Sequence, residues 1–178
     1  MINRVPKTKR DLMKHPIEDA KVDAIIIEPA PRRPKSYEPV VVSVGDELLA
    51  IKNLLETIGW TQLDLCAKQS VEGIGFSNAA GDTALFAGNL DLEPDIKPFE
   101  GVLFTDFLGN QAVVSEVAFR RLMDRFFTIL IEISNERHLK IRADPRWPVF
   151  LEYAERMKQL ARGASQVTAL MYDADGGE

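Results

Sequence analysis

The stretch SEVAFRRLMDRFFTILIEISNE, residues 115–136, decides the fold. Its apolar residues recur every three or four positions, which places them on one face of an α-helix. Val117, Phe127 and Ile131 widen that face, and the polar residues are confined to one narrow strip. An apolar face this broad indicates burial on most sides. We therefore predict a long buried helix. It packs either within the hydrophobic core on all its apolar sides, or against the core on one side and in an interface with another protein on the other. The main row of apolar residues is Phe119, Leu122, Met123, Phe126, Ile129, Leu130 and Ile133.

Shorter elements are expected before this helix. Apolar residues at helical spacing predict two short helices. Two apolar runs on either side of a Gly-containing loop, residues 78–82, predict a β-hairpin, and one more apolar run predicts a further strand. The expected helices cover residues 46–58 and 61–69, and the expected strands cover residues 71–77, 83–87 and 101–105.

After the long helix we expect a strand and a further helix. Residues 138–143 alternate between apolar and polar, as in a half-buried strand. Pro148 suits the first turn of a helix, and Gly163 suits its C-terminal cap. Residues 166–172 are a possible final strand. The whole pattern predicts an α+β fold, with one long buried helix and two or three shorter helices packed on a small mixed or antiparallel sheet.

The first 44 residues differ in composition from the rest of the chain. They hold six of the ten prolines and carry a net charge of +3, whereas the remainder carries −8. Proline-rich segments favour extended backbone. We therefore predict an extended N-terminal arm over residues 1–44, a single α+β domain over residues 45–172 and a polar tail over residues 173–178. Opposite charge attracts such an arm to the acidic body of its own chain or of a neighbour.

Two short apolar bursts interrupt the arm. Residues 23–28 and 39–44 each predict a short strand, and the segment between them is typical of an extended linker. The isoleucine burst needs an apolar surface to cover it. It either pairs with the edge of the body's own sheet or adds a strand to a neighbouring chain. The candidate partner-binding residues of the arm are Ile25, Ile26, Ile27, Arg32, Arg33 and Tyr37.

The composition is that of an ordinary globular protein, with 46% hydrophobic residues. The single cysteine, Cys66, fits a reducing compartment and occupies an apolar helical position, where a buried thiol is expected. No apolar run approaches the roughly 18–20 residues of a membrane span, and residues 3–10 lack a signal-peptide core. We expect a soluble intracellular protein, cytoplasmic or part of an assembled particle. The acidic body disfavours broad contact with nucleic acid.

Few residues have the spacing of a catalytic or metal site. The two histidines lie far apart, with no second ligand at the spacing of a zinc site. Asp91, Glu93 and Asp95 alternate, which suits either a hard cation or a solvated acidic loop. Asp106 stands between aromatic residues and either caps a turn or acts as an acid–base group with a raised pKa. We expect no cofactor and no metal.

Residues 51–68 contain the sequence Gly-Trp-Thr-Gln at 59–62 and the apolar–small pair Leu65-Cys66. This pattern resembles the first two helices of the lambda-repressor-like helix-turn-helix family. The resemblance implies DNA binding through a recognition helix over residues 72–80. That segment contains two glycines and no Lys or Arg, so it departs from the family pattern where phosphate contacts anchor the reading helix.

Three functions remain open from the sequence. The first is a non-enzymatic protein–protein interaction or assembly protein, such as an accessory or structural subunit of a phage- or plasmid-type complex. Its arm would contact a protein partner or a second copy of the chain. The second is a DNA-binding regulator with a degenerate helix-turn-helix at 45–80. The third is an enzyme or small-ligand-binding domain that uses Asp106, Glu93 and Asp95. We expect the first, without enzymatic activity.

Overall fold

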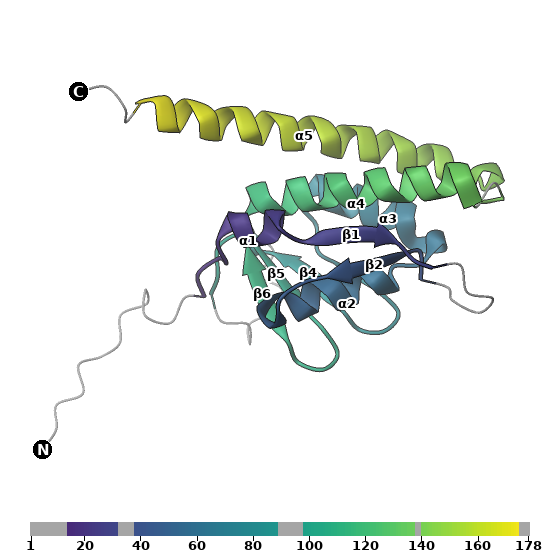
Figure 1. The fold of residues 1–178 in the computed structure, drawn as a ribbon, viewed down its shortest axis with the longest axis horizontal. Helices are drawn as coiled ribbons and strands as arrows, with labels where there is room; N and C mark the ends of the chain where they lie inside the picture. The colour runs from purple at the N-terminus through teal and green to yellow at the C-terminus, as the bar shows by residue number, and fades with distance from the viewer. Residues whose placement is uncertain (1–13, 32–37, 89–97, 138–139, 175–178) are drawn as a thin grey trace, which may run out of the picture.

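The computed structural model describes residues 14–31, 38–88, 98–137 and 140–174, and for residues 165–174 it describes the backbone alone. This part of the chain has an α+β fold with five α-helices and two small antiparallel sheets, which confirms the fold class expected from the sequence (Figure 1). The elements are α1 (Asp19–Asp23), β1 (Ile26–Pro29), β2 (Val40–Ser43), η2 (Asp46–Leu48), α2 (Leu49–Thr57), η3 (Trp60–Gln62), α3 (Leu63–Glu72), β3 (Phe76–Ser77), β4 (Thr83–Phe86), β5 (Val102–Thr105), β6 (Gln111–Val114), α4 (Glu116–Arg137), η5 (Ile141–Ala143) and α5 (Trp147–Ala174), where η marks a short 3-10 helix.

Helix α4 lies at the centre of the fold, as its apolar pattern predicted. It begins after Ser115, whose hydroxyl accepts a hydrogen bond of 3.0 Å from the backbone N–H of Ala118 and so caps the first turn. Nine of its residues are buried. Figure 1 shows α4 between α5 and the strands. The ring of Phe119 lies 5.1 Å from that of Phe86 and 6.0 Å from that of Phe104, centroid to centroid, so α4 packs directly on β4 and β5.

Strands β3 to β6 form a sheet in which each strand pairs with the next along the chain. Side chains alternate between the two faces of a strand. Phe86 and Phe104 therefore face the main core with α4, whereas Leu103 and Val113 face the other way. These two residues form a second, smaller apolar cluster with Phe99. The sheet is thus apolar on both faces.

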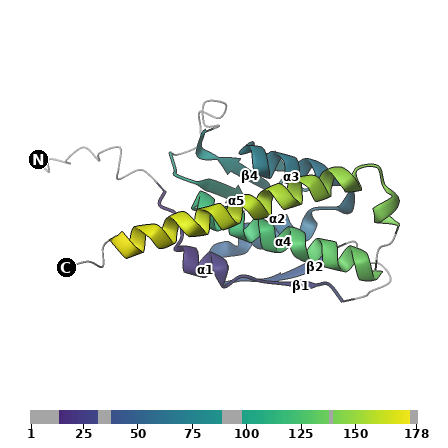
Figure 2. The same cartoon turned by 90° about the horizontal axis from the view of Figure 1, so that it is seen from above.

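Helix α5 packs along α4 and also contacts α3. Figure 2 shows it crossing over both helices. Phe127 of α4 and Phe150 of α5 make an edge-to-face contact at 5.5 Å between ring centroids. Trp147 lies 5.0 Å from Phe150 and 6.5 Å from Trp60. An aromatic pair contributes roughly 0.5–1.5 kcal/mol beyond simple burial, so the pairs with Phe127 and Trp60 attach the first turns of α5 to the body.

Residues 14–31 and 38–44, which belong to the proline-rich arm, pack against their own chain. Ile25 is 3% exposed and lies in the same core as α4. The backbone N–H of Ile17 donates to the carbonyl oxygen of Val113 at 2.8 Å, along the outer edge of β6. The described part of the arm is not extended throughout, because it contains helix α1. Its isoleucine burst pairs with β2 and not with the four-stranded sheet.

Two predictions for the C-terminal part of the chain are wrong. Residues 141–143 form the 3-10 helix η5 and not a strand, because so short an alternation does not specify one. Helix α5 runs through Gly163 to Ala174, so Gly163 is not a cap and residues 166–172 are not a strand. A glycine inside a helix costs about 1 kcal/mol relative to alanine. The packing of α5 on α3 and α4 offsets this cost.

The segment that corresponds to a recognition helix is not helical. Helix α3 ends at Glu72, and Gly73 follows with φ = 68°, the left-handed conformation that commonly ends helices. Phe76 and Ser77 then form β3, which pairs with β4. The helix-turn-helix resemblance therefore stops at α3. The strand expected over residues 71–77 is present only in its last two residues, because α3 extends further than the sequence predicted.

Candidate functional site

The candidate partner-binding residues of the arm lie in different environments. Ile25 is buried in the core of its own chain, and Ile27 is half-buried. Ile26 is 55% exposed on β1. Ile26 is therefore the exposed member of this set within the part of the arm that the structure describes. Arg32, Arg33 and Tyr37 lie outside the described residues.

Of the candidate acidic residues, Asp106 lies within the part of the chain that the structure describes. Asp106 is 6% exposed and directly follows β5. Within the ranges that the structure describes, no three metal-binding side chains come together. Asp91, Glu93 and Asp95, which suit either a hard cation or a solvated acidic loop, lie outside the described residues.

Asp106 organises the turn between β5 and β6. Its Oδ1 accepts hydrogen bonds from the backbone N–H groups of Leu108 at 3.0 Å and Asn110 at 2.8 Å. Its Oδ2 accepts from the side-chain amides of Asn110 at 2.8 Å and Asn53 at 2.7 Å. Burial raises the pKa of Asp106, but the hydrogen bonds outweigh it and hold the pKa below its usual value. Asp106 therefore caps a turn as an anion.

The turn between β3 and β4 has the same pattern of hydrogen bonds, in which the side chain of the first residue accepts from the backbone N–H groups of the third and fifth residues and also bonds to the side chain of the fifth. We call this pattern the hydrogen-bond frame of the turn. Asn78 Oδ1 accepts from the backbone N–H groups of Ala80 at 2.9 Å and Asp82 at 3.0 Å. Asn78 Nδ2 donates to Asp82 Oδ2 at 2.7 Å. In both turns the fourth residue is a glycine with positive φ, 92° at Gly81 and 87° at Gly109. Only glycine adopts this conformation without strain, so both turns require it.

The two turns differ in their middle residues. Residues 78–82 read Asn-Ala-Ala-Gly-Asp, and residues 106–110 read Asp-Phe-Leu-Gly-Asn. Phe107 is 67% exposed and Leu108 is 68% exposed, the highest fractions among the exposed large apolar side chains of the described residues. Because two alanines suffice in the first turn, the shared frame does not require phenylalanine and leucine in the second.

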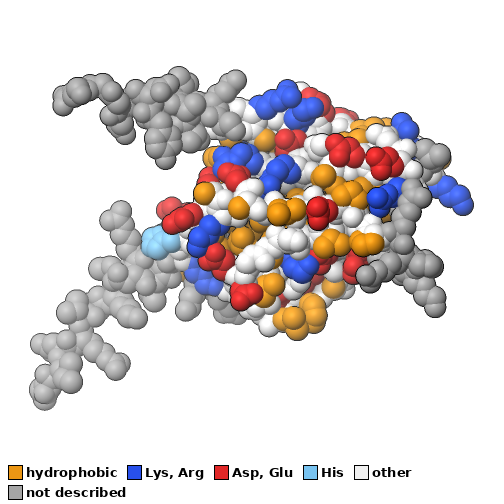
Figure 3. Space-filling view, viewed as in Figure 1, with side chains coloured by type: hydrophobic (Ala, Val, Ile, Leu, Met, Phe, Trp, Pro, Cys, Tyr) orange, Lys and Arg blue, Asp and Glu red, His pale blue; other side chains and the backbone are white. Residues whose placement is uncertain are grey.

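Both turns are attached to helix α2. The Thr57 hydroxyl donates to Asp82 Oδ2 at 3.0 Å, and Asn53 holds Asp106 as described above. The backbone N–H of Phe107 donates to Asp82 Oδ1 at 3.2 Å, which joins the two turns. Figure 3 shows an apolar projection at the lower edge of the molecule, where Figure 1 draws the β5–β6 turn. The exposed pair thus stands on a rigid support.

A separate pocket of about 270 Å³ lies between α4, α5 and the end of α1. The polar strip of α4 contributes three of its residues, which fall three and four positions apart and so share one face. The lining residues are Asp23, Arg121, Asp124, Arg125, Ala161 and Arg162.

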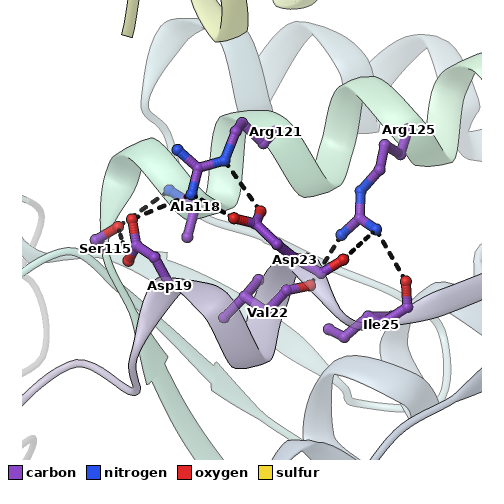
Figure 4. A network of polar contacts seen from close by, with 8 residues as sticks. All are labelled: Asp19, Val22, Asp23, Ile25, Ser115, Ala118, Arg121 and Arg125. Atoms are coloured by element: carbon purple, nitrogen blue, oxygen red, sulfur yellow. Dashed lines mark hydrogen bonds and ion pairs between the residues drawn. The ribbon is translucent and has the colours of Figure 1, made fainter. Parts of the chain in front are cut away.

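Asp23 and Asp19 fix the guanidinium group of Arg121. Arg121 donates to Asp23 through Nε at 3.0 Å and through Nη2 at 2.8 Å, and Nη2 also lies 3.2 Å from Asp19 Oδ2. Asp19 in turn accepts from the Ser115 hydroxyl at 2.7 Å (Figure 4). The hydrogen bond with Asp23 raises the pKa of Arg121. This two-point contact fixes the orientation of the guanidinium plane.

Arg125 is held by backbone carbonyl groups. It donates to the carbonyl oxygens of Val22 at 2.8 Å and of Asp23 and Ile25 at 2.9 Å, around the C-terminal end of α1 (Figure 4). Arginine near the C-terminal end of a helix commonly donates to carbonyl oxygens in this way. Burial lowers the pKa of Arg125, because its charge is partly removed from water.

Asp124 lies between the two arginines on α4 and faces α5. Burial raises the pKa of Asp124, and the positive charges of Lys158 and Arg162 on α5 oppose this rise. Arg162 is exposed, and none of the hydrogen bonds or ion pairs found within the described ranges involves it. The pocket therefore combines two arginines fixed by α1, a third arginine from α5 and a partly buried carboxylate.

Sequence reasoning missed both features. Residues 106–110 repeat the polar-x-x-Gly-polar pattern of residues 78–82, so the hairpin signal recognised in the first turn was also present in the second. Arg121 and Arg125 fall in the polar strip of α4, where arginines are ordinarily solvated. Nothing in their spacing shows that α1 covers them.

Within the described ranges, no helix combines the length and the apolar character needed to cross a membrane. In comparisons with known proteins, no family model, no curated sequence and no solved structure matches this chain.

Proposed function

We propose that this chain is a non-enzymatic protein–protein interaction component, an accessory or structural subunit of a larger complex, and that Phe107 and Leu108 anchor its partner. One observation carries the proposal. The two turns have the same hydrogen-bond frame, but one has two alanines where the other exposes a phenylalanine and a leucine. A role in contact accounts for large apolar side chains that the turn itself does not need.

The energetics of this turn favour binding. Burying a phenylalanine or leucine side chain contributes roughly 1.5–3 kcal/mol relative to leaving it in water. Asp82 and Asp106 already hold the backbone of the turn, so little conformational freedom is lost when a partner covers it. Few residues carry most of the binding energy at protein interfaces, and aromatic anchors are prominent among them.

The partner that fits this anchor is a different protein with a concave apolar pocket. Two side chains provide far less than the ≈ 800 Å² per partner of a stable interface, so two such turns facing each other are too small to hold a dimer. The pocket of this chain described above is lined by charged residues. Membrane binding is disfavoured, because residues 78–82 and 106–110 contain no Lys or Arg to attract anionic lipid.

The arm supplies a second contact surface in this proposal. Ile26 is 55% exposed and Val41 is 37% exposed, on paired strands of the β1–β2 hairpin. This face carries Ile26 and Val41 together with Glu28 and Ser43, which are also exposed, so it is mixed apolar and polar. We expect it to add area around the anchor's interface and to contribute less binding energy than Phe107 and Leu108.

Site-specific photo-crosslinking tests the proposal. A photoreactive phenylalanine analogue replaces Phe107 in the full-length chain, expressed in its native cells. A matched control carries the analogue at Leu65, which is 55% exposed on α3. We expect a discrete adduct with another protein from position 107 and none of the same mass from position 65.

Three results would contradict the proposal. They are the absence of an adduct at position 107, identical adducts at both positions, and an adduct with the mass of two copies of this chain. The last result would show that the partner is a second copy of this chain and not a different protein.

A further inference from the structure

We propose that the pocket between α1, α4 and α5 binds the phosphate group of a small molecule. The guanidinium group of arginine is planar and matches the oxygens of phosphate through two parallel hydrogen bonds. Three arginines, Arg121, Arg125 and Arg162, line this one pocket. The inference does not rest on the Phe107–Leu108 contact, because the two sites use different residues.

Two of the three guanidinium groups are positioned before a ligand arrives. Asp19 and Asp23 hold Arg121, and three backbone carbonyls hold Arg125. These bonds use Nε and Nη2 of Arg121 and both terminal nitrogens of Arg125. Within the described residues they leave Nη1 of Arg121 and Nε of Arg125 as available donors. Donors that are already fixed lose little conformational entropy on binding. Figure 4 shows both side chains extending from α4 towards α1.

The charged residues that line the pocket are three arginines and two aspartates, a net charge of +1. The carboxylate of Asp23 is engaged by Arg121 at 2.8 Å. The half-buried Arg125 donates to neutral carbonyl groups, and none of the ion pairs found among the described residues involves it. A phosphate group beside Arg125 and Arg162 balances their charge. Asp124 opposes an anion. Lys158 and Arg162 of α5 reduce this repulsion, whereas Glu155 of the same helix adds to it.

The size of the pocket limits the ligand. Its volume of about 270 Å³ is just below the range of roughly 300–1,000 Å³ typical of ligand pockets. Ala161, with its short side chain, is the one apolar lining residue. These features suit a phosphate group with a small organic substituent. A free phosphate ion presents the same group to the arginines.

Arg162→Gln is the decisive variant, because it removes a positive charge from the pocket and leaves the α1–α4 contacts in place. Arg120→Gln is the matched control. Arg120 lies on α4 next to Arg121, pairs with Glu116 at 3.1 Å and does not line the pocket. The wild-type chain and both variants are titrated with inorganic phosphate and with glycerol phosphate at constant ionic strength. Backbone amide chemical shifts report the binding.

We expect saturable shifts confined to the end of α1 and the facing parts of α4 and α5. Loss of a charged hydrogen bond should weaken binding in Arg162→Gln by at least about tenfold, and Arg120→Gln should bind as the wild type does. Tighter binding of glycerol phosphate identifies an ester as the ligand, and equal binding identifies the phosphate ion itself. Shifts that do not saturate, or equal affinity in Arg162→Gln, overturn the proposal. Neither result bears on crosslinking at position 107.

Discussion

Asp82 and Phe107, which belong to different turns, are joined by a hydrogen bond of 3.2 Å from the backbone N–H of Phe107 to Asp82 Oδ1. Asp82 is 1% exposed, and hydrogen bonds shielded from water are stronger. Thr57 attaches the same carboxylate to α2. The apolar pair at positions 107 and 108 therefore projects from a turn whose backbone is bonded to the β3–β4 turn, which is itself attached to α2. The proposed contact requires such a fixed turn.

Asp106 should make the stability of the fold depend on acid pH. Burial raises its pKa, but its hydrogen bonds prevail and hold the pKa below the ordinary value of 3.8. The unfolded chain therefore takes up this proton first as the pH falls. The stabilising contribution of Asp106 is complete above the unfolded-state pKa and is lost as the pH falls through the folded-state pKa.

The variant Asp106→Asn should lack this dependence on pH. Its amide group faces the donors of Asn53 and Asn110, so it should lose about 1–3 kcal/mol of unfolding free energy at neutral pH. Urea unfolding at pH 7 and at pH 3 measures both effects. A variant that loses as much stability in acid as the wild type would show that Asp106 is not the group responsible.

Gly101 and Gly109 provide a matched pair of backbone tests. Both have positive φ, 94° and 87°. A methyl group at Gly101 would overlap the carbonyl oxygen of Val114, whereas nothing lies within 4 Å of one at Gly109. Gly109→Ala should cost roughly 1–2 kcal/mol from backbone strain. Gly101→Ala adds the clash and should cost at least about 4 kcal/mol. Equal losses in thermal unfolding would contradict the close approach of Gly101 to β6.

Ile25 and Ile26 test how the arm packs. Ile25 is 3% exposed in the main core, and its neighbour Ile26 is 55% exposed. Ile25→Ala should lower the unfolding free energy by about 2–5 kcal/mol, whereas Ile26→Ala should change it by less than about 0.5 kcal/mol. Chemical denaturation of the two variants measures the difference. A small effect for both would mean that this segment does not contribute to the core.

Cys66 reports opening of the fold. Its side chain is buried, and burial raises the pKa of the thiol to about 12. Because the thiolate is the reactive form, a thiol reagent at pH 8 should label the native protein only through unfolding events. The labelling rate should rise with denaturant in parallel with global unfolding. Rapid stoichiometric labelling without denaturant would contradict the buried position of Cys66.

The elements that could be predicted from the sequence are those in which the apolar periodicity is long or the residues are strongly apolar. Residues 115–136 were expected as a helix, and α4 spans Glu116–Arg137. The same reasoning failed where a pattern was short, as at residues 141–143, or where packing outweighed local preference, as at Gly163. Glycine lowers helix propensity, but contacts of α5 with α3 and α4 lie far away in sequence, and local patterns do not contain them.

The candidate sites were less accessible to sequence reasoning than the fold. Asp106 was singled out because of its aromatic neighbours, and turn capping was one of its two expected roles. Asp106 and Asn78 occupy the same position in their turns and accept the same two backbone hydrogen bonds, which becomes clear only when the two turns are compared in the structure. The arginine-lined pocket depends on α1, which the sequence analysis treated as extended arm. A contact between residues about 100 positions apart, such as Asp23 and Arg121, has no local signal.

The most direct test of the proposed function is the affinity of the crosslinked partner for the double variant Phe107→Ala/Leu108→Ala. This variant places in the β5–β6 turn the two alanines of the β3–β4 turn, so it should fold and melt as the wild type does. Leu65→Ala is the control. Calorimetric titration should give a dissociation constant at least about 30-fold higher for the double variant, the effect of losing one strong anchor of about 2 kcal/mol, and no change for the control. Equal affinity of the double variant and the wild type would contradict the proposal that these two side chains anchor a partner.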